Sequence, residues 1–242
     1  MAGIAVYSLK GGVGKTTLAV NLAWCAATLS ARRTLLWDLD PQAASTFLLP
    51  ATNPARGQAQ AIFSKDVDPA KVIRATDLDR IDILGADASL RGLDLLFHEL
   101  DKKKRLAKLL ATVVKDYDRV ILDCPPGLTE TAEQVMRAVD LIVVPVVPSP
   151  LAIRAFEEVR AHLGSRGTAP PLMPVHMMVD RRRSLHAAAL AAHPDWPVIP
   201  MASAIEQMAV RREPVGLFAP RSAAAAAFAD VWRAVERRLA RG

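Results

Sequence analysis

The sequence has few cysteines and no long apolar segment. Its two cysteines, Cys25 and Cys124, lie far apart, which excludes a disulfide scaffold and favours a reducing compartment. The longest uncharged apolar run, residues 141–153, contains three prolines and is too short to cross a bilayer. The chain starts with Met1 and an apolar strand pattern, without the basic segment of a signal peptide. These absences predict a soluble cytoplasmic protein.

The remaining composition is that of a folded globular chain. Of the 242 residues, 51% are hydrophobic and 23% are charged, which excludes disorder. This length is enough for one large α/β domain or two small ones. Because no internal repeat or linker interrupts the chain, we expect residues 1–242 to form a single domain.

Positive charge is concentrated in the last third of the chain. Residues 151–242 contain 13 arginines and no lysine, against 8 acidic residues, whereas residues 1–150 contain 18 basic and 17 acidic residues. A basic half favours a polyanionic partner, either nucleic acid or an anionic lipid surface. Arginine suits such a partner because its guanidinium forks onto phosphate. The alternative is an arginine-rich surface that interacts only with solvent.

Strand and helix patterns alternate along the whole chain. This alternation predicts an α/β fold: a doubly wound, mostly parallel sheet with helices on both faces. The expected strands are residues 3–8, 34–37, 81–84, 119–122, 141–147, 172–179 and 198–200. The expected helices are residues 16–29, 42–48, 90–115, 151–163 and 222–240, and residues 50–79 are expected to be irregular with weak helical pieces.

A glycine-rich segment lies between the first strand and the first helix. Residues 10–17 read K-G-G-V-G-K-T-T. They fit the phosphate-loop pattern G-x-x-x-x-G-K-[ST] in a modified form, since residues 9–12 read L-K-G-G where its first glycine is expected. Gly11, Gly12 and Gly14 allow backbone N–H groups to close around phosphate oxygens at the positive end of the helix. The sequence therefore predicts a nucleotide phosphate site.

Three further side chains of this loop can bind the phosphates or Mg²⁺. Lys15 supplies a positive charge to the β- and γ-phosphates, and the Thr16 hydroxyl is a ligand for Mg²⁺. Lys10 stands at the start of the loop, where it cannot easily reach its own nucleotide. It can act across a dimer interface, like an arginine finger given in trans, or it can simply face solvent at a strand end.

Aspartates follow two of the predicted strands. Asp123 comes directly after the apolar run 120–122, and Asp38 and Asp40 end the strand at 34–37. Carboxyl ends of parallel strands meet at the ligand-binding edge of a doubly wound sheet. We expect Asp123 to support Mg²⁺, and Asp38 or Asp40 to orient the attacking water or to hold Mg²⁺ through water. The alternative for each is a turn or strand-end aspartate.

These motifs together resemble the ParA/Soj branch of the ParA–MinD superfamily of deviant phosphate-loop ATPases. Residues 10–17 match its deviant Walker A box, and D-L-D-P-Q at 38–42 matches its switch I motif. I-L-D-C-P-P at 121–126 matches switch II with the Walker B aspartate, and V-V-P-V at 143–146 resembles a later strand of the family. The segments 178–181, 212–215 and 219–222 also resemble family segments, so the resemblance covers essentially the whole chain.

The resemblance implies an ATP-dependent sandwich dimer, with ATP and Mg²⁺ as cofactors. In that family the dimer binds DNA without sequence preference, and a partner protein stimulates slow hydrolysis. Carried onto this sequence, Lys10 is the trans lysine, Lys15 the cis lysine, and Asp40 positions the hydrolytic water. The implied metal residues are Thr16, Asp40 and Asp123, and the implied nucleotide contacts are Lys10, Gly11, Gly12, Val13, Gly14, Lys15, Thr16, Thr17, Asp180, Arg181 and Pro200.

The same resemblance implies that the protein binds DNA and positions a cargo on the nucleoid. The candidate DNA contacts are Arg181, Arg182, Arg183, Arg211, Arg212, Arg221 and Arg237, with Arg233, Arg238 and Arg241 as further arginines of the basic third. Many family members carry I-P-R-N where residues 199–202 read I-P-M-A, so a DNA contact at that position is in question. A ParB-like or other small activator is the expected partner. Plasmid, chromosome region and protein cluster all remain open as the cargo.

Two other classes of protein compete with this interpretation. A MinD-like ATPase on the membrane is favoured by the apolar positions of the last helix, Phe228, Val231, Trp232, Val235 and Leu239, which are flanked by arginines. The same spacing is typical of a terminal helix docked on the sheet, so we expect no stable membrane association. An iron protein of the nitrogenase type needs cysteines that bridge a cluster, and neither the spacing nor the placement of the two cysteines fits.

Overall fold

The computed structural model describes residues 2–52, 59–64, 67–100, 104–165 and 169–241. The strands form one sheet in the order β3-β4-β2-β5-β1-β6-β7-β8. All neighbouring strands are parallel except β3 and β4, which are antiparallel. The predicted doubly wound, mostly parallel α/β fold is therefore confirmed.

The elements follow the alternation of the sequence. The strands are β1 (Ala2–Val6), β2 (Thr34–Asp38), β3 (Arg74–Ala75), β4 (Ile81–Leu84), β5 (Arg119–Asp123), β6 (Leu141–Val146), β7 (Leu172–Val179) and β8 (Val198–Pro200). The α-helices are α1 (Lys15–Leu29), α2 (Ala44–Leu48), α3 (Ala61–Ser64), α4 (Leu93–Leu100), α5 (Arg105–Val113), α6 (Glu130–Met136), α7 (Pro150–Gly164), α8 (Ser184–Ala192), α9 (Ser203–Glu206), α10 (Met208–Arg211), α11 (Val215–Phe218) and α12 (Ala223–Leu239). Short 3-10 helices are η1 (Pro69–Lys71), η2 (Ala88–Gly92) and η3 (Val114–Asp116).

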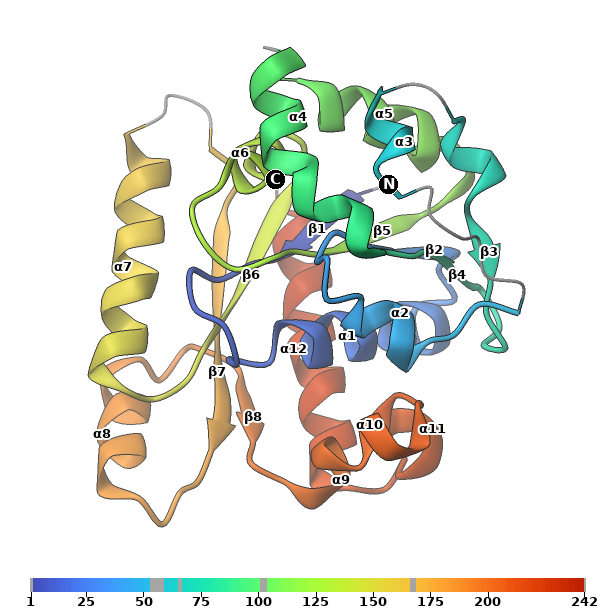
Figure 1. Ribbon diagram of the computed structural model, residues 1–242. Coiled ribbons are helices and arrows are strands. Elements are labelled where there is room, and N and C mark those ends of the chain that lie inside the picture. The colour runs from blue at the N-terminus through green and yellow to red at the C-terminus, as the bar shows by residue number, and fades with distance from the viewer. Residues whose placement is uncertain (1, 53–58, 65–66, 101–103, 166–168, 242) are drawn as a thin grey trace.

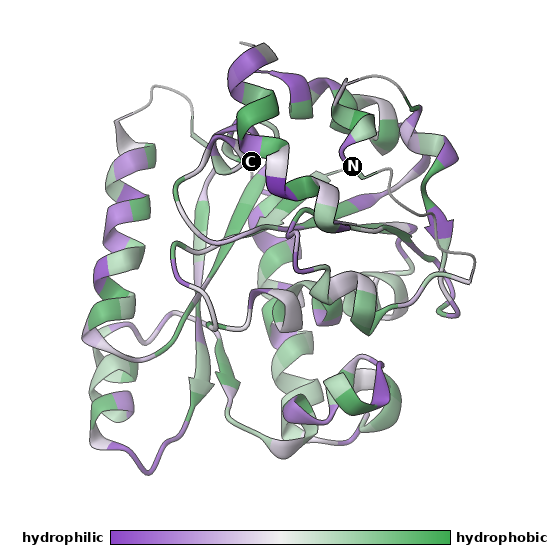
Figure 2. Ribbon diagram, in the orientation of Figure 1, coloured by the Kyte–Doolittle hydropathy of each residue, from purple (hydrophilic) through white to green (hydrophobic). Residues whose placement is uncertain are grey.

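Two apolar cores lie on the two faces of the sheet, because successive residues of a strand point to opposite sides. In β1, Ile4 and Val6 join the core under α1, α11 and α12, whereas Ala5 joins the core under α3 to α7, as does Tyr7 directly after the strand. Figure 1 shows α1 and α12 on one face and α4, α5 and α6 on the other. The central strands are apolar along their length in Figure 2, as expected for strands that are covered on both faces.

The single helix predicted for residues 90–115 is wrong. The structure has η2, α4 and α5 there, and the basic residues 102 and 103 lie outside the described part of the chain. Phe97 of α4 and Leu106 of α5 are both buried in the same core. Nine positions are about two and a half turns at 3.6 residues per turn, so one straight helix places these two side chains on opposite sides. The helix therefore has to break between them.

Some short elements were not predicted. The irregular stretch 50–79 contains the short edge strand β3, and helices α6 and α8 follow β5 and β7. The segment between β8 and α12 forms the three short helices α9, α10 and α11. Each of these helices has four residues, which is too short to show a helical period in a sequence.

The last helix, α12, packs on the sheet as expected. Its apolar positions Phe228, Val231, Trp232 and Val235 are buried in the core that also contains α1. The docked alternative for this stripe is therefore confirmed. Within the described residues, no helix is both long enough and apolar enough to span a membrane.

We expect Trp232 to contribute strongly to stability. Its side chain is 1% exposed, and its indole N–H donates to the Ser30 hydroxyl at 2.8 Å. Trp232→Ala is expected to lower the free energy of unfolding by about 3–5 kcal/mol, because it leaves a cavity between α1 and α12. Urea denaturation measures this loss. The control Arg237→Ala, on the exposed side of the same helix, is expected to change it by less than about 0.5 kcal/mol. Equal effects of the two substitutions would contradict the docking.

Candidate functional site

The loop between β1 and α1 is built to receive an anion. Gly12 and Gly14 have φ angles of 71° and 89°, a conformation that side chains other than glycine rarely adopt. Gly14 is the N-cap of α1, and no side chain caps this helix. The first-turn N–H groups of α1 are therefore available to a ligand at the positive end of the helix dipole. A Cβ on Gly14 would also lie 2.8 Å from the Met177 methyl carbon, so a larger residue would displace the end of this buried side chain.

The two lysines of the loop have different surroundings. Lys15 is 7% exposed, and its ammonium group donates to the Lys10 carbonyl at 3.3 Å. Lys10 is half-buried, and its side chain is not part of the lining of the cleft described below. Lys15 is thus held inside the loop, whereas Lys10 stands at its outer edge.

A cleft of about 710 Å³ opens in front of this loop, within the usual size of ligand sites. The phosphate loop, the segment after β2 and the segment after β5 form its walls together with η2 and α4. Its lining residues are Gly11, Gly12, Gly14, Lys15, Thr16, Thr17, Leu39, Asp40, Pro41, Gln42, Leu90, Arg91, Asp94, Pro125, Pro126, Thr129, Thr131 and Met178. Most of the predicted loop residues and Asp40 therefore meet in one cleft, and the buried Val13 lies behind it.

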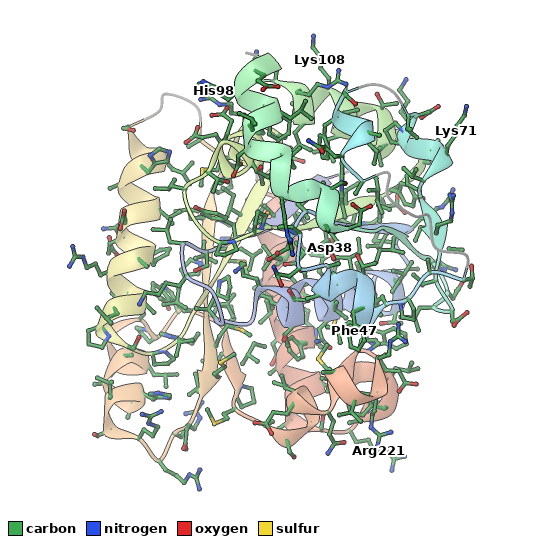
Figure 3. The ribbon with its side chains drawn as sticks, in the orientation of Figure 1. Asp38, Phe47, Lys71, His98, Lys108 and Arg221 are labelled. Carbon is green, nitrogen blue, oxygen red and sulfur yellow. The ribbon has the colours of Figure 1, made fainter. Side chains whose placement is uncertain are left out.

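Asp38 and Asp123 lie behind the cleft and are completely buried. They are neighbours in the register of β2 and β5. Burial raises the pKa of both carboxyl groups above the usual range of aspartate, and the charge of Asp123 raises that of Asp38 further. Hydrogen bonds from Thr46 to Asp38 act in the opposite direction, as do the hydroxyls near Asp123 and the charge of Lys15. Figure 3 shows Asp38 in the interior of the molecule.

Two hydroxyl residues of α2, which were not predicted as site residues, hold these carboxylates. Ser45 donates to Oδ2 of Asp123 at 2.7 Å. Thr46 donates to Oδ2 of Asp38 through its N–H at 2.9 Å and through its hydroxyl at 2.8 Å, and the same hydroxyl accepts from the Ala86 N–H. A Ser-Thr pair shortly after an aspartate motif is the only sequence signal for this role.

The residues present fit a magnesium ion. The hydroxyl of Thr16 and the carboxylate of Asp40 line the cleft, and both are oxygen donors of the kind that Mg²⁺ prefers. Oδ1 of Asp123 is buried and accepts no hydrogen bond at good geometry from the described residues. A buried carboxylate oxygen without a donor is costly unless a cation or its bound water faces it. Asp38, by contrast, accepts hydrogen bonds from Thr46 and from the Asp40 N–H, and it does not line the cleft.

The nucleotide contacts expected outside the phosphate loop lie at the ends of β7 and β8. Val179 and Pro200 are neighbours in the register of these strands, and Asp180 follows directly. Asp180 is paired with Arg182, whose Nε and Nη2 donate to it at 2.9 Å and 3.0 Å. Arg181 is exposed. From this region Met178 lines the cleft, whereas Asp180, Arg181 and Pro200 do not.

The structure does not bring all candidate DNA contacts together. The turn of residues 181–183 between β7 and α8 and the exposed Arg221 lie along the lower edge of the molecule in Figures 1 and 3. Arg211 and Arg212 lie over the rings of Phe218 and Phe47. Arg237 is next to Arg238, which lines a hollow with Ala2 and Arg119 at the amino ends of the strands. Arg237 therefore lies at the opposite end of α12 from Arg221.

Comparison with known proteins identifies the family. The AAA domain family model AAA_31 matches residues 1–164. The sporulation initiation inhibitor protein Soj of Bacillus subtilis is 29% identical over 96% of this chain and 97% of its own length. The chromosome partitioning protein ParA of Caulobacter vibrioides is 30% identical over 75% of this chain and 71% of its own length. The chain belongs to the ParA/Soj branch of the ParA–MinD superfamily of phosphate-loop ATPases.

Solved structures share the whole fold. Apo McdA from Cyanothece superposes with a TM-score of 0.84 at 19% identity, covering 99% of both chains. The septum site-determining protein MinD from Pyrococcus horikoshii, solved with Mg-ADP, has a TM-score of 0.79 at 22% identity, covering 97% of this chain and 95% of that one. At these identities the similarity concerns the fold.

We expect Thr46 to stabilise the strand ends through its hydroxyl. Thr46→Val keeps the side-chain shape but removes a donor to Asp38 and an acceptor for Ala86, so it is expected to lower the free energy of unfolding by about 1–3 kcal/mol. Thr46→Ser keeps the hydroxyl and is expected to lose less. Denaturant unfolding measures both. The matched control is Thr28→Val, since the Thr28 hydroxyl bonds only locally, to the Trp24 carbonyl of its own helix. A loss for Thr46→Val no larger than for this control would contradict the role.

Proposed function

We propose that this protein is an ATPase that forms an ATP-dependent dimer, binds DNA without sequence preference and positions a cargo on the nucleoid. The observation that carries the proposal is the phosphate loop. It joins two glycines with positive φ, an uncapped helix N-terminus and a buried lysine near the buried carboxylate of Asp123. Membership of the ParA/Soj branch supports the finer parts of the proposal.

ATP and Mg²⁺ are the cofactors of this site. The N–H groups of the loop and Lys15 bind the phosphates, and Thr16 and Thr17 supply hydroxyls on the first turn of α1. Thr16, Asp40 and Asp123 would hold Mg²⁺, which neutralises phosphate charge when it is bound. Asp40 lines the cleft and orients the attacking water. Lys10, at the outer edge of the loop, reaches the phosphates of the second protomer. Asp180, Arg181 and Pro200 bind the adenine side of the nucleotide.

Hydrolysis in this site is slow without a partner. Among the described residues, Asp40 is the one carboxylate of the segment after β2, the switch I segment, that lines the cleft. Its own N–H is held by Asp38, and its side chain accepts from the Gln42 N–H at 2.9 Å. A small activator protein of the ParB kind would reorder this segment and the segment after Asp123. The cargo is set by that partner.

Two substitutions test the ATPase part. Lys15→Ala is expected to abolish nucleotide binding, because it removes the buried cation of the loop. Asp40→Ala is expected to keep ATP binding and to lower turnover at least tenfold, which leaves an ATP-bound dimer. Calorimetry, phosphate release and sedimentation measure binding, turnover and assembly. Unaltered turnover of Asp40→Ala would refute its role.

We place the DNA surface at the edge of the molecule that carries the β7–α8 turn and the start of α12, the lower edge in Figures 1 and 3. Arg181, Arg183 and Arg221 are exposed there and make no ion pair with the described residues. Changing all three to Ala is expected to weaken binding of random-sequence DNA with ATP. The slope of log affinity against log salt is expected to fall by about 1 for each DNA phosphate that the variant no longer neutralises.

The control for this surface is the double variant Arg237→Ala and Arg238→Ala, at the other end of α12. If DNA binding disappears in the control and persists in the triple variant, the DNA surface lies at the Arg237 end of α12 instead. Absence of DNA binding with ATP, ADP or no nucleotide would overturn DNA as the partner, and liposomes would then replace DNA.

A further inference from the structure

Arg91 places a free guanidinium in the wall of the phosphate cleft. It belongs to η2, its side chain is exposed, and it lines the cleft with Gly11, Lys15 and Asp40. It makes no hydrogen bond or ion pair with the described residues. No sequence motif marks it. Inside a long amphipathic helix, as predicted for residues 90–115, it would be an ordinary surface arginine.

The backbone around Arg91 is held in place. Asp87 caps η2, with Oδ1 accepting from the Ser89 N–H at 2.8 Å and Oδ2 accepting from the Ala59 N–H at 3.2 Å. On either side of Arg91, Leu90 and Leu93 are buried in the core, at 4% and 2% exposure. The position of the Arg91 Cα is therefore fixed, while its side chain is free to turn.

This wall is also tied to the segment after Asp123. Asp94, one turn beyond Arg91, accepts hydrogen bonds on Oδ1 from the Thr131 N–H at 2.8 Å and from the Thr131 hydroxyl at 2.7 Å. Thr131 lies in the first turn of α6, which follows the proline-rich turn after β5. Asp94 is thus engaged with α6, which leaves the charge of Arg91 available to the cleft.

We propose that Arg91 is a further cation of the nucleotide site, binding the terminal phosphate of the nucleotide in its own protomer. This inference rests on the proposed nucleotide binding. Lys15 stands on α1, which packs on one face of the sheet, and Arg91 precedes α4, which packs on the other face (Figure 1). The two cations therefore approach a phosphate chain from opposite walls. A guanidinium forks onto two phosphate oxygens, so a contact between Arg91 and the terminal phosphate would favour the triphosphate over the diphosphate.

Titration calorimetry with Mg²⁺ and either ADP or a non-hydrolysable ATP analogue tests the proposal. The proteins are the wild type, Arg91→Ala, Arg91→Lys and the control Arg160→Ala, an exposed arginine of α7 that pairs only with Glu157. Arg91→Ala is expected to bind the analogue about tenfold more weakly and ADP within twofold of the wild type. Arg91→Lys is expected to recover part of the loss, because a lysine keeps the charge but not the fork. Arg160→Ala is expected to match the wild type.

The alternative outcomes separate the two proposals. Equal affinities of wild type and Arg91→Ala for the analogue, or an equal loss for the analogue and ADP, overturn the role of Arg91 alone. A loss that appears only as the protein concentration is raised also overturns it, since Arg91 then acts on the nucleotide of the second protomer. A wild-type protein that binds neither nucleotide overturns the proposed function itself.

Discussion

The arrangement of this site depends on two carboxylates buried side by side. Asp38 and Asp123 end neighbouring strands in register, and neither is exposed to solvent. Two buried like charges oppose folding unless donors and cations surround them. Asp38 receives its donors from Thr46 and from the Asp40 N–H, and Asp123 receives one from Ser45 while Lys15 lies nearby. The location of α2 follows from this requirement, because its two hydroxyls are these donors.

The same contacts join the ends of three neighbouring strands. The Thr46 hydroxyl binds Asp38 at the end of β2 and the Ala86 N–H just after β4, and Ser45 binds Asp123 at the end of β5. Asp40 lies two residues beyond Asp38, and its N–H is fixed by the Asp38 carboxylate. A displacement of α2 would therefore disturb both buried carboxylates and the cleft-lining Asp40 together. A partner that touches α2 would act on the chemistry without entering the cleft.

Much of this architecture was predictable from local pattern. Buried parallel strands such as β2, β5 and β6 are short, mostly apolar runs, and the glycines, lysines and threonines of residues 10–17 already indicate a phosphate loop. The features that were not predicted depend on contacts between distant segments of the chain. Phe97 and Leu106 show a break in the helix only once both are known to face one core. Ser45, Asp94 and Arg91 have ordinary local surroundings, and only the fold brings them to the cleft or to its carboxylates.

The surfaces that the arginines form also depend on the fold and were not predictable from the sequence. Their number in the last third predicts a polyanion, but α12 separates Arg221 from Arg237 by its whole length. A count of charges cannot tell which of them share a surface. The fold places residues 181–183 in the β7–α8 turn and Arg221 just before α12, whereas Arg238 lies at the amino ends of the strands.

The uncapped start of α1 has a consequence for the lifetime of the protein. Because no side chain satisfies the first N–H groups of this helix, a bound phosphate chain completes it. Any ligand that binds only the folded chain stabilises it by mass action, by about 2.7 kcal/mol at a hundredfold excess over its dissociation constant. The free nucleotide concentration, relative to its dissociation constant, therefore sets how often the folded chain opens to proteases. A fall in that concentration would shorten the life of the folded chain.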